Sequence, residues 1–284
     1  MVKKIIIAIA CIVVVFGAVY CYVYFKATKV PANNAQAMLQ STLPADKKIV
    51  VCFGDSLTHA TVSFDYVSYM ANDPDLQNFV FVNEGINSRL VYNLLQVVDN
   101  VIALKPHYIF IWIGTNDLKG SLNDAEYQRY NDLWNLPQRP TKEWFEQNYR
   151  QLVVILKTKT QAKIVLVSLP PLGENIESLP FKLTMEYSAI IRDIAKKEKL
   201  GYIGLNEILT RDLIREGKRD VAPYTTGLWF MYSAILQHYL FGRDWDAISE
   251  SRGLTYMTDN IHLNGKGGRI LAAAMKEILI SGNK

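Results

Sequence analysis

Short apolar runs alternate with longer amphipathic stretches along the chain from Lys47 onward. The short runs are rich in Val, Ile, Phe and Tyr and show little two-residue alternation, which is typical of parallel strands that are covered on both faces. We therefore expect five buried strands. They lie at Ile49–Phe53, Phe79–Val82, Tyr108–Ile113, Ile164–Leu169 and Tyr202–Leu205.

The stretches between these strands place apolar residues three and four positions apart, which is the spacing of an amphipathic helix. Helix stop signals follow two of them, Pro106 after the first and Gly201 after the third. The predicted helices are Leu90–Leu104, Trp144–Leu156, Met185–Leu200 and Gly265–Ile280. Strands that alternate with helices predict one α/β domain, with a five-stranded parallel sheet as the middle of three layers.

A different pattern precedes this domain. Ile5–Phe25 is an almost unbroken apolar run behind Lys3 and Lys4, and as a helix it would reach about 30 Å, enough to cross a bilayer. A cleaved signal peptide is the alternative, although its apolar region normally spans only about 7–15 residues. We therefore expect an uncleaved membrane anchor over residues 1–26, with the N-terminus inside and the domain exported.

Residues 27–46 contain Pro, Asn and several Ala, a composition that predicts a linker between the anchor and a globular domain over residues 47–284. Two stretches of this domain exceed the plain alternation of strands and helices. Leu118–Pro140 follows the third strand, and the sequence indicates no role for it. Pro223–Gly242 is mostly apolar and aromatic, so it suits either a second membrane span or a buried or substrate-facing helix. The polar residues within it favour the helix.

Charge and cysteine content exclude several classes of protein. Four of the 31 basic residues flank the N-terminal apolar run, and the remaining 27 balance the 27 acidic residues. A neutral domain offers no electrostatic basis for binding nucleic acid. Cys52 is the single cysteine of the domain, so no disulfide can form within it. No cluster of His, Cys and acidic residues has metal-ligand spacing, and we expect no metal or other cofactor.

Polar residues that could take part in catalysis collect where the predicted strands end. The first strand ends in Gly54-Asp55-Ser56-Leu57, at the sheet edge where open α/β folds bind ligands. Ser56 suits two roles there. Its hydroxyl can act as a nucleophile, or it can cap a helix, because Asp and Ser both accept hydrogen bonds from the free amides of a helix start.

The pair Asp259 and His262 bears on this choice. Residues three apart approach each other in a turn, so the Asp259 carboxylate can accept from Nδ1–H of His262 and leave Nε2 to take a proton from a serine. Ser56 would then be an activated nucleophile with a base and an orienting carboxylate. A helix cap requires no such partners, so the pair favours the nucleophile.

Acyl transfer also needs donors for the oxyanion of the tetrahedral intermediate. The backbone N–H groups of Ser56 and Gly85 and the side-chain amide of Asn116 are three candidates. Each lies at the carboxyl end of a predicted strand, so all three can meet at one edge of the sheet.

Four sequence blocks, in this order, resemble the SGNH (GDSL) hydrolase superfamily over about residues 47–280. The blocks are Gly54-Asp55-Ser56-Leu57, the block around Gly85, Gly114-Thr115-Asn116-Asp117 and Asp259-x-x-His262. The resemblance implies a flavodoxin-like sandwich with Ser56 as nucleophile, His262 as base and Asp259 as its partner. It also implies an oxyanion hole made by Ser56, Gly85 and Asn116. Thr58-His59-Ala60 departs from the family, in which many members have a glycine soon after the serine.

The expected function is that of a membrane-anchored serine esterase acting outside the cytoplasm, possibly on O-acetyl groups of a glycan. Lysophospholipase or lipase-like activity suits the aromatic stretch Pro223–Gly242, and an acyltransferase would use the same nucleophile. A non-catalytic binding protein on the same fold is the remaining alternative, which the full set of catalytic residue types disfavours. The expected partners are a small-molecule, glycan or lipid ester and, through the N-terminal helix, a membrane.

Overall fold

The computed structural model describes residues 2–217 and 220–282. A parallel five-stranded sheet runs through the domain in the order β2-β1-β3-β4-β5, which is the flavodoxin-like order. The strands are β1 (Lys48–Gly54), β2 (Phe79–Gly85), β3 (Tyr108–Trp112), β4 (Lys163–Val167) and β5 (Gly201–Ile203). The predicted three-layer α/β sandwich with five parallel strands is thus confirmed.

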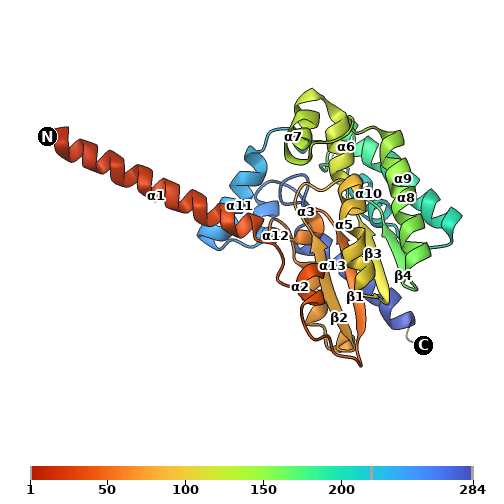
Figure 1. Ribbon diagram of the computed structural model, residues 1–284. Coiled ribbons are helices and arrows are strands. Elements are labelled where there is room, and N and C mark those ends of the chain that lie inside the picture. Colours follow the sequence, from red (N-terminus) through yellow and green to blue (C-terminus); the bar gives the residue numbers. More distant parts are fainter. Residues whose placement is uncertain (1, 218–219, 283–284) are drawn as a thin grey trace.

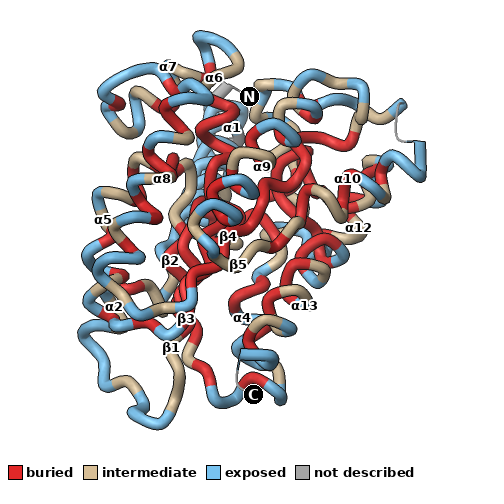
Figure 2. The backbone as a smooth tube through the Cα atoms, turned by 90° about the vertical axis from the view of Figure 1, so that its right-hand side faces the viewer, coloured by how far each residue is buried: buried red, intermediate tan, exposed pale blue. Residues whose placement is uncertain are grey.

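Successive residues of the central strands enter two separate cores. In β1, Val51 and Phe53 face one helical layer, whereas Val50 and Cys52 face the other. The first layer contains α5 (Val91–Ala103), α8 (Lys142–Lys159) and α9 (Leu179–Glu198), and the second contains α4 (Tyr66–Ala71), α10 (Leu205–Glu216) and α13 (Gly265–Ser281). Figure 2 shows the buried residues concentrated along the sheet. Because neither face meets water, the strands appear in the sequence as continuous apolar runs.

The remaining elements are short or lie outside these layers. They are α2 (Ala35–Leu39), α3 (Ser56–His59), η1 (Pro74–Leu76), α6 (Thr115–Leu122), α7 (Asp124–Trp134), α11 (Trp229–Phe241) and α12 (Trp245–Glu250). Helices α6 and α7 pack against each other and account for most of the stretch Leu118–Pro140, whose structure the sequence pattern did not predict.

Residues 27–46 fold against the domain, which corrects the expectation of a linker. Asn33 Nδ2 donates to the carbonyl of Phe81 in β2 at 3.0 Å. Ala35, the first residue of α2, is fully buried, and its N–H donates to Glu84 Oε2 at 2.8 Å. Composition could not reveal this docking because its partners belong to a strand about fifty residues away, as the separation of 49 between Ala35 and Glu84 shows.

Helix α1 (Val2–Thr28) projects away from the domain (Figure 1). Within the described part of the chain it is the one helix long and apolar enough to cross a membrane. Most of its apolar side chains are exposed. Among those whose burial the structure describes, only Val23 and Ala27 near its C-terminal end are buried, in a cluster shared with α11. Its length and composition suit both a membrane anchor and a signal sequence.

Helix α11 lies at the surface beside α1. Of the two expectations for a helix within Pro223–Gly242, buried or substrate-facing, the buried one is therefore wrong for this element. Only Ala234 and Ile235 of its 13 residues are buried. With about 20 Å of length, it is also too short to cross a bilayer. The apolar residues of α11 therefore lie largely on the surface, and the contact with α1 accounts for only some of them.

Candidate active site

Ser56 is the first residue of α3, directly after β1 and Asp55. The helix is capped by Asp55, whose Oδ1 accepts from the Leu57 N–H at 3.0 Å. The helix-cap interpretation therefore applies to Asp55 and leaves the Ser56 hydroxyl for other contacts. The Ser56 N–H belongs to the first turn, where backbone amides have no acceptor within the helix.

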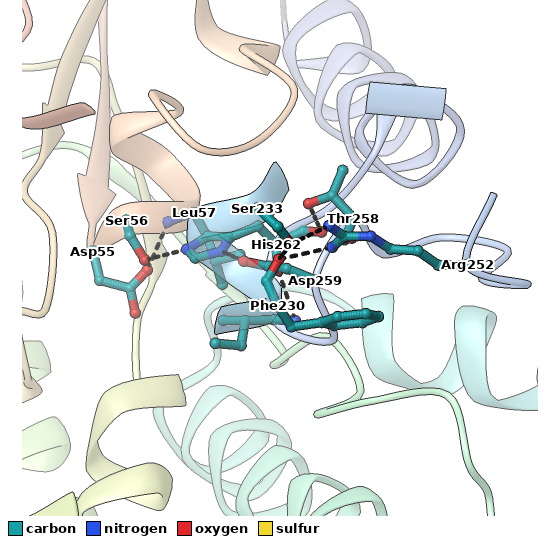
Figure 3. A network of polar contacts seen from close by, with 10 residues as sticks. Asp55, Ser56, Leu57, Phe230, Ser233, Arg252, Thr258, Asp259 and His262 are labelled. Carbon is teal, nitrogen blue, oxygen red and sulfur yellow. Dashed lines mark hydrogen bonds and ion pairs between the residues drawn. The ribbon is translucent and has the colours of Figure 1, made fainter. Parts of the chain in front are cut away.

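Ser56, His262 and Asp259 form a continuous hydrogen-bonded chain (Figure 3). Ser56 Oγ lies 2.9 Å from His262 Nε2, and His262 Nδ1 lies 2.8 Å from Asp259 Oδ2. All three residues are buried. A carboxylate at Nδ1 keeps the proton of a neutral ring on that nitrogen, which leaves Nε2 to accept from the serine hydroxyl. The three residues that the sequence analysis singled out thus meet in hydrogen-bonding geometry.

A tight turn brings Asp259 and His262 together. The Thr258 N–H donates to the His262 carbonyl at 2.8 Å, and the His262 N–H donates to Asp259 Oδ1 at the same distance. Asn260 adopts a left-handed conformation with φ of 69°, which asparagine tolerates better than most residues. The local sequence therefore dictates the pairing of base and carboxylate.

The Asp259 carboxylate is held in its ionised form. Burial by itself would raise its pKa. The neighbouring His262 ring and the hydrogen bonds from His262 and Ile261 more than offset burial, and the pKa of Asp259 lies below its ordinary value. An ionised carboxylate at this position stabilises the imidazolium that forms when His262 takes a proton.

Arg252 connects the turn of Asp259 to helix α11 (Figure 3). Its Nη1 donates to the carbonyls of Thr258 at 2.6 Å and Phe230 at 2.8 Å, and its Nη2 donates to Ser233 Oγ at 2.8 Å. The guanidinium also stacks 4.1 Å from the centre of the Phe230 ring. No sequence signal marks this arginine, because its partners are set by the tertiary packing of α11.

The side chain of Asn116 is held in one orientation. Its Nδ2 donates to the Arg89 carbonyl at 2.9 Å and lies 3.3 Å from Asp55 Oδ2, while its Oδ1 accepts from the Tyr130 hydroxyl at 2.7 Å. Tyr130 belongs to α7, in the stretch for which the sequence indicated no role. One function of that stretch is therefore to orient the Asn116 amide at the site.

Gly85 lies at the end of β2, packed against the backbone of α3. A Cβ atom at this position would lie 2.2 Å from the His59 nitrogen, so only glycine permits this approach. The Gly85 N–H donates to Asn83 Oδ1 at 3.1 Å. The amide expected to face an oxyanion is therefore engaged by a residue of its own strand.

Two more carboxyl groups are buried beside the site. Burial raises the pKa of Asp55 to about 6, against the opposing hydrogen bond from Leu57. Burial also raises the pKa of Asp117 to about 7, although its Oδ2 accepts from the Val91 N–H at 3.1 Å. Asp117 thereby joins the start of α5 to α6.

Lys119 is a buried cation that the sequence analysis did not single out. Burial lowers its pKa, and the charge of Glu126 opposes that shift, with smaller contributions from Asp259 and Asp55. Its Nζ lies 5.8 Å from the ring centres of both Tyr130 and Tyr224. Lys119 thus brings an amino group into a region that otherwise concentrates carboxyl groups.

A cavity of about 210 Å³ lies beside Asp259. It is lined by Asp259–Ile261 and by residues between Ala222 and Met231, which include the first turn of α11. The beginning of the aromatic stretch Pro223–Gly242 therefore borders the site. Among the residues that the structure describes, no group of three or more His, Cys, Asp and Glu side chains is arranged to hold a metal ion.

Several proteins of known structure share this fold. The structure is similar to that of the acetyl xylan esterase AlAXEase, with 20% identity, a TM-score of 0.56, and coverage of 81% of this chain and 98% of that one. It is also similar to Axe2, an acetylxylan esterase from Geobacillus stearothermophilus, with 20% identity, a TM-score of 0.53, and coverage of 80% and 92%. At this identity the likeness shows the shared fold.

LAE5, described as an alpha/beta hydrolase enzyme from the metagenome of Lake Arreo, Spain, is a third similar structure. It has 18% identity, a TM-score of 0.54, and coverage of 82% of this chain and 94% of that one. No curated protein matches the sequence significantly. The model of the GDSL-like lipase/acylhydrolase family matches residues 52–270. The chain therefore belongs to the GDSL-like lipase/acylhydrolase family and is an SGNH-type ester hydrolase.

Proposed function

We propose that Ser56, His262 and Asp259 are the catalytic triad of a membrane-anchored serine esterase. The observation that carries this proposal is the unbroken chain of hydrogen bonds from Ser56 Oγ through the His262 ring to Asp259. The three residues supply the groups that ester hydrolysis requires: the Ser56 hydroxyl to attack, a His262 ring nitrogen to accept its proton, and the Asp259 carboxylate to orient the ring.

In the proposed reaction, Ser56 Oγ attacks the ester carbonyl carbon while its proton moves to His262 Nε2. The carbonyl oxygen becomes the oxyanion of a tetrahedral intermediate. His262 then gives the proton to the leaving alkoxide oxygen as the carbon–oxygen bond breaks, which leaves an acyl group on Ser56. A water molecule, deprotonated by His262, attacks this acyl group, and the proton returns to Ser56 as the acid is released.

The oxyanion would accept hydrogen bonds from the Ser56 N–H and from Asn116 Nδ2. The first amide lies at the start of a helix, and the second is oriented by Tyr130 and by the Arg89 carbonyl. Because its other N–H faces Asp55 Oδ2 at 3.3 Å, Asn116 would exchange that longer contact for one to the oxyanion. The Gly85 N–H is the third donor that the family resemblance implies. It can serve only if it exchanges its present hydrogen bond to Asn83 Oδ1 for one to the oxyanion.

The substrate class that we propose is an O-acetyl ester, carried by a glycan. Ser56 is only 9% exposed, and such confined surroundings favour a small acyl group. Two of the similar structures are acetyl xylan esterases. A lipid ester is the second candidate, because large apolar side chains of α11 are exposed beside α1. Faster turnover of an acetyl than of an octanoyl ester supports the first substrate, and the reverse order supports the second.

We further propose that α1 remains attached and anchors the domain to a membrane, with the domain outside the cytoplasm. The end of the helix is built into the protein. Thr61 Oγ1 and Asn87 Nδ2 donate to the Ala27 carbonyl at 2.7 and 2.8 Å, and His59 Nε2 donates to the Lys29 carbonyl at 2.9 Å. A signal peptide that is removed has no need of such contacts.

The test is turnover of a short-chain aryl acetate by the full chain in detergent, before and after Ser56→Ala. We expect the substitution to lower kcat by at least ~10³-fold, as the loss of a triad nucleophile does. Ser63→Ala is the matched control, since Ser63 is buried and its hydroxyl has no partner among the described residues. Unchanged activity in Ser56→Ala would refute the assignment. Adding a sugar acceptor to the same assay would reveal acyl transfer.

A further inference from the structure

Helix α11 exposes large apolar side chains where α1 leaves the domain. The exposed fractions are 75% for Trp229, 49% for Tyr232, 45% for Leu240 and 71% for Phe241. We call these four residues the α11 patch. Helical spacing places the first three on one side of α11, and Phe241 follows at its end. Single exposed apolar residues are ordinary, but a cluster on one short helix marks an interaction surface.

The position of α1 shows which partner this patch meets. The apolar run begins at Ile5, and a hydrocarbon core of about 30 Å accommodates about 20 helical residues, so the core would end near Tyr24. The α1 residues that pack with α11 are Val19, Val23 and Ala27. They extend from about 8 Å inside that boundary to just beyond it. Helix α11 is therefore at the depth at which amphipathic helices lie in a membrane interface.

The junction between α1 and the domain leaves little freedom to move α11 away from a bilayer. Thr61 Oγ1 donates to Ala27 at the end of α1, and the Thr61 carbonyl accepts from the hydroxyl of Tyr239 in α11. A single loop residue thus holds both helices. Once α1 has inserted, the orientation of α11 relative to the bilayer is fixed by these contacts and by the apolar cluster around Val62 and Ile235.

The charges at this boundary are compatible with a phospholipid surface. Lys26 and Lys29 are exposed at the end of α1, at the level expected for headgroups. Basic side chains at that level interact favourably with lipid phosphates, and more so where the lipids are anionic. The aromatic rings of Trp229 and Tyr232 belong to the residue types that are enriched at the same level.

We propose that the α11 patch lies in the membrane interface and holds the active site against the bilayer surface. The inference rests on the proposed anchoring by α1. His59, which is bonded to the end of α1, is three residues after Ser56, or about 5 Å along the helix axis. The enzyme is therefore positioned for esters within the bilayer surface or on glycans directly adjoining it.

The test uses the full chain in nanodiscs of phosphatidylcholine and phosphatidylglycerol, with plain acyl chains or with chains brominated near the headgroup. Bromine quenches nearby tryptophan, and α1 contains no tryptophan. The emission of Trp229 is obtained as the difference between the wild type and Trp229→Phe. We expect bromination to reduce this difference by about half or more, as for an interfacial residue.

The outcomes separate the inference from the anchoring on which it rests. A chain that does not co-elute with the discs overturns both. Co-elution without quenching of Trp229 overturns the inference alone. Two copies per disc, with Trp229 shielded from bromine, would assign the α11 patch to a second copy of the chain and also overturn it.

A kinetic measurement adds an independent readout. Phe241→Ser removes an apolar side chain of the α11 patch that does not line the cavity. We expect it to lower turnover of an ester embedded in the disc by at least ~3-fold, by weakening interfacial contact, and to leave turnover of a soluble aryl acetate unchanged. An equal change with both substrates would contradict the proposal.

Discussion

Around Ser56 the chain buries polar groups, whereas along α11 it exposes apolar ones. Asp55, Asp117 and Asp259 are almost completely buried, and Trp229 and Phe241 are largely exposed. Both regions are unfavourable in isolation, because a buried polar group loses its hydration and an exposed apolar one orders water. The cost of burying these carboxyl groups is partly offset by hydrogen bonds within the protein, although Asp117 Oδ1 has no partner among the described residues. The exposed apolar side chains of α11 have no covering partner among the described residues, so they indicate a partner outside the chain.

Arg252 is the point at which the two regions meet. It is bonded to the carbonyl of Thr258, next to Asp259, and to Phe230 and Ser233 in the first turns of α11. Arg252 thereby connects α11, a surface helix with few buried residues, to the turn that holds Asp259 and His262. In the proposed enzyme, α11 would contribute to catalysis by positioning the site, and the residues around Ser56 would contribute the chemistry.

The largest effect on kcat is expected from a substitution of Asp259 in the buried polar region. Asp259→Asn keeps the shape of the side chain but cannot hold the His262 ring with its proton on Nδ1. We expect kcat to fall by about 10³–10⁴-fold, measured with an aryl acetate. Asp99→Asn, which changes an exposed carboxylate on α5, should leave kcat unchanged. A loss below ~10-fold would show that Asp259 is not the orienting group.

The next largest effect is expected from the oxyanion donor. Asn116→Ala should lower kcat by about 10²–10³-fold with a smaller change in KM, because its amide acts chiefly on the transition state. Tyr130→Phe removes only the hydrogen bond that orients Asn116, so its effect should be several-fold smaller. An equal or larger loss in Tyr130→Phe would mean that the tyrosine itself contacts the substrate.

The cost of burying carboxyl groups can be measured at Asp117. Burial raises its pKa from 3.8 to about 7, so the folded protein retains a proton that the unfolded chain releases. Stability therefore falls as the pH rises from about 4 to 7. Asp117→Asn should remove much of this slope, by an amount on the order of 4 kcal/mol over the full window.

The measurement for Asp117→Asn is the free energy of urea unfolding at pH 4.5, 6 and 8, with pH values chosen about the titration window. Asp55 has a raised pKa in the same window, so a smaller slope should remain in the variant. Asp132→Asn, at an exposed position, is the control and should leave the slope unchanged. An unchanged slope in Asp117→Asn would show that this carboxyl is ionised despite its burial.

The smallest effect on kcat is expected from removing the hydrogen bonds by which Arg252 connects α11 to the Asp259 turn. Arg252→Gln should lower kcat by about 10-fold and leave KM nearly unchanged, since the Asp259 turn loses a support rather than a reacting group. Arg139→Gln, at an exposed ion pair with Asp124, is the control. If Arg252→Gln raised KM instead, the arginine would act on substrate binding through the adjoining cavity.

Much of the fold was predictable because its signals are local. Strands buried on both faces must be apolar at every position, and each strand of the sheet was identified to within a few residues. Polar residues directly after such strands must lie at one edge of a parallel sheet. The residue types and the Asp-x-x-His spacing then restricted the chemistry to a serine nucleophile with its base, and the family match agrees with that class.

The sequence by itself thus determined the class of fold, the family and the candidate catalytic residues, because periodicity and turn chemistry act over a few neighbouring positions. The tertiary structure alone decided that Asp55 caps α3, that Asn83 engages the Gly85 amide, and that α11 lies beside α1. Ser56 and His262 are 206 positions apart. Which distant segments meet depends on the packing of the whole domain, and no local pattern records it.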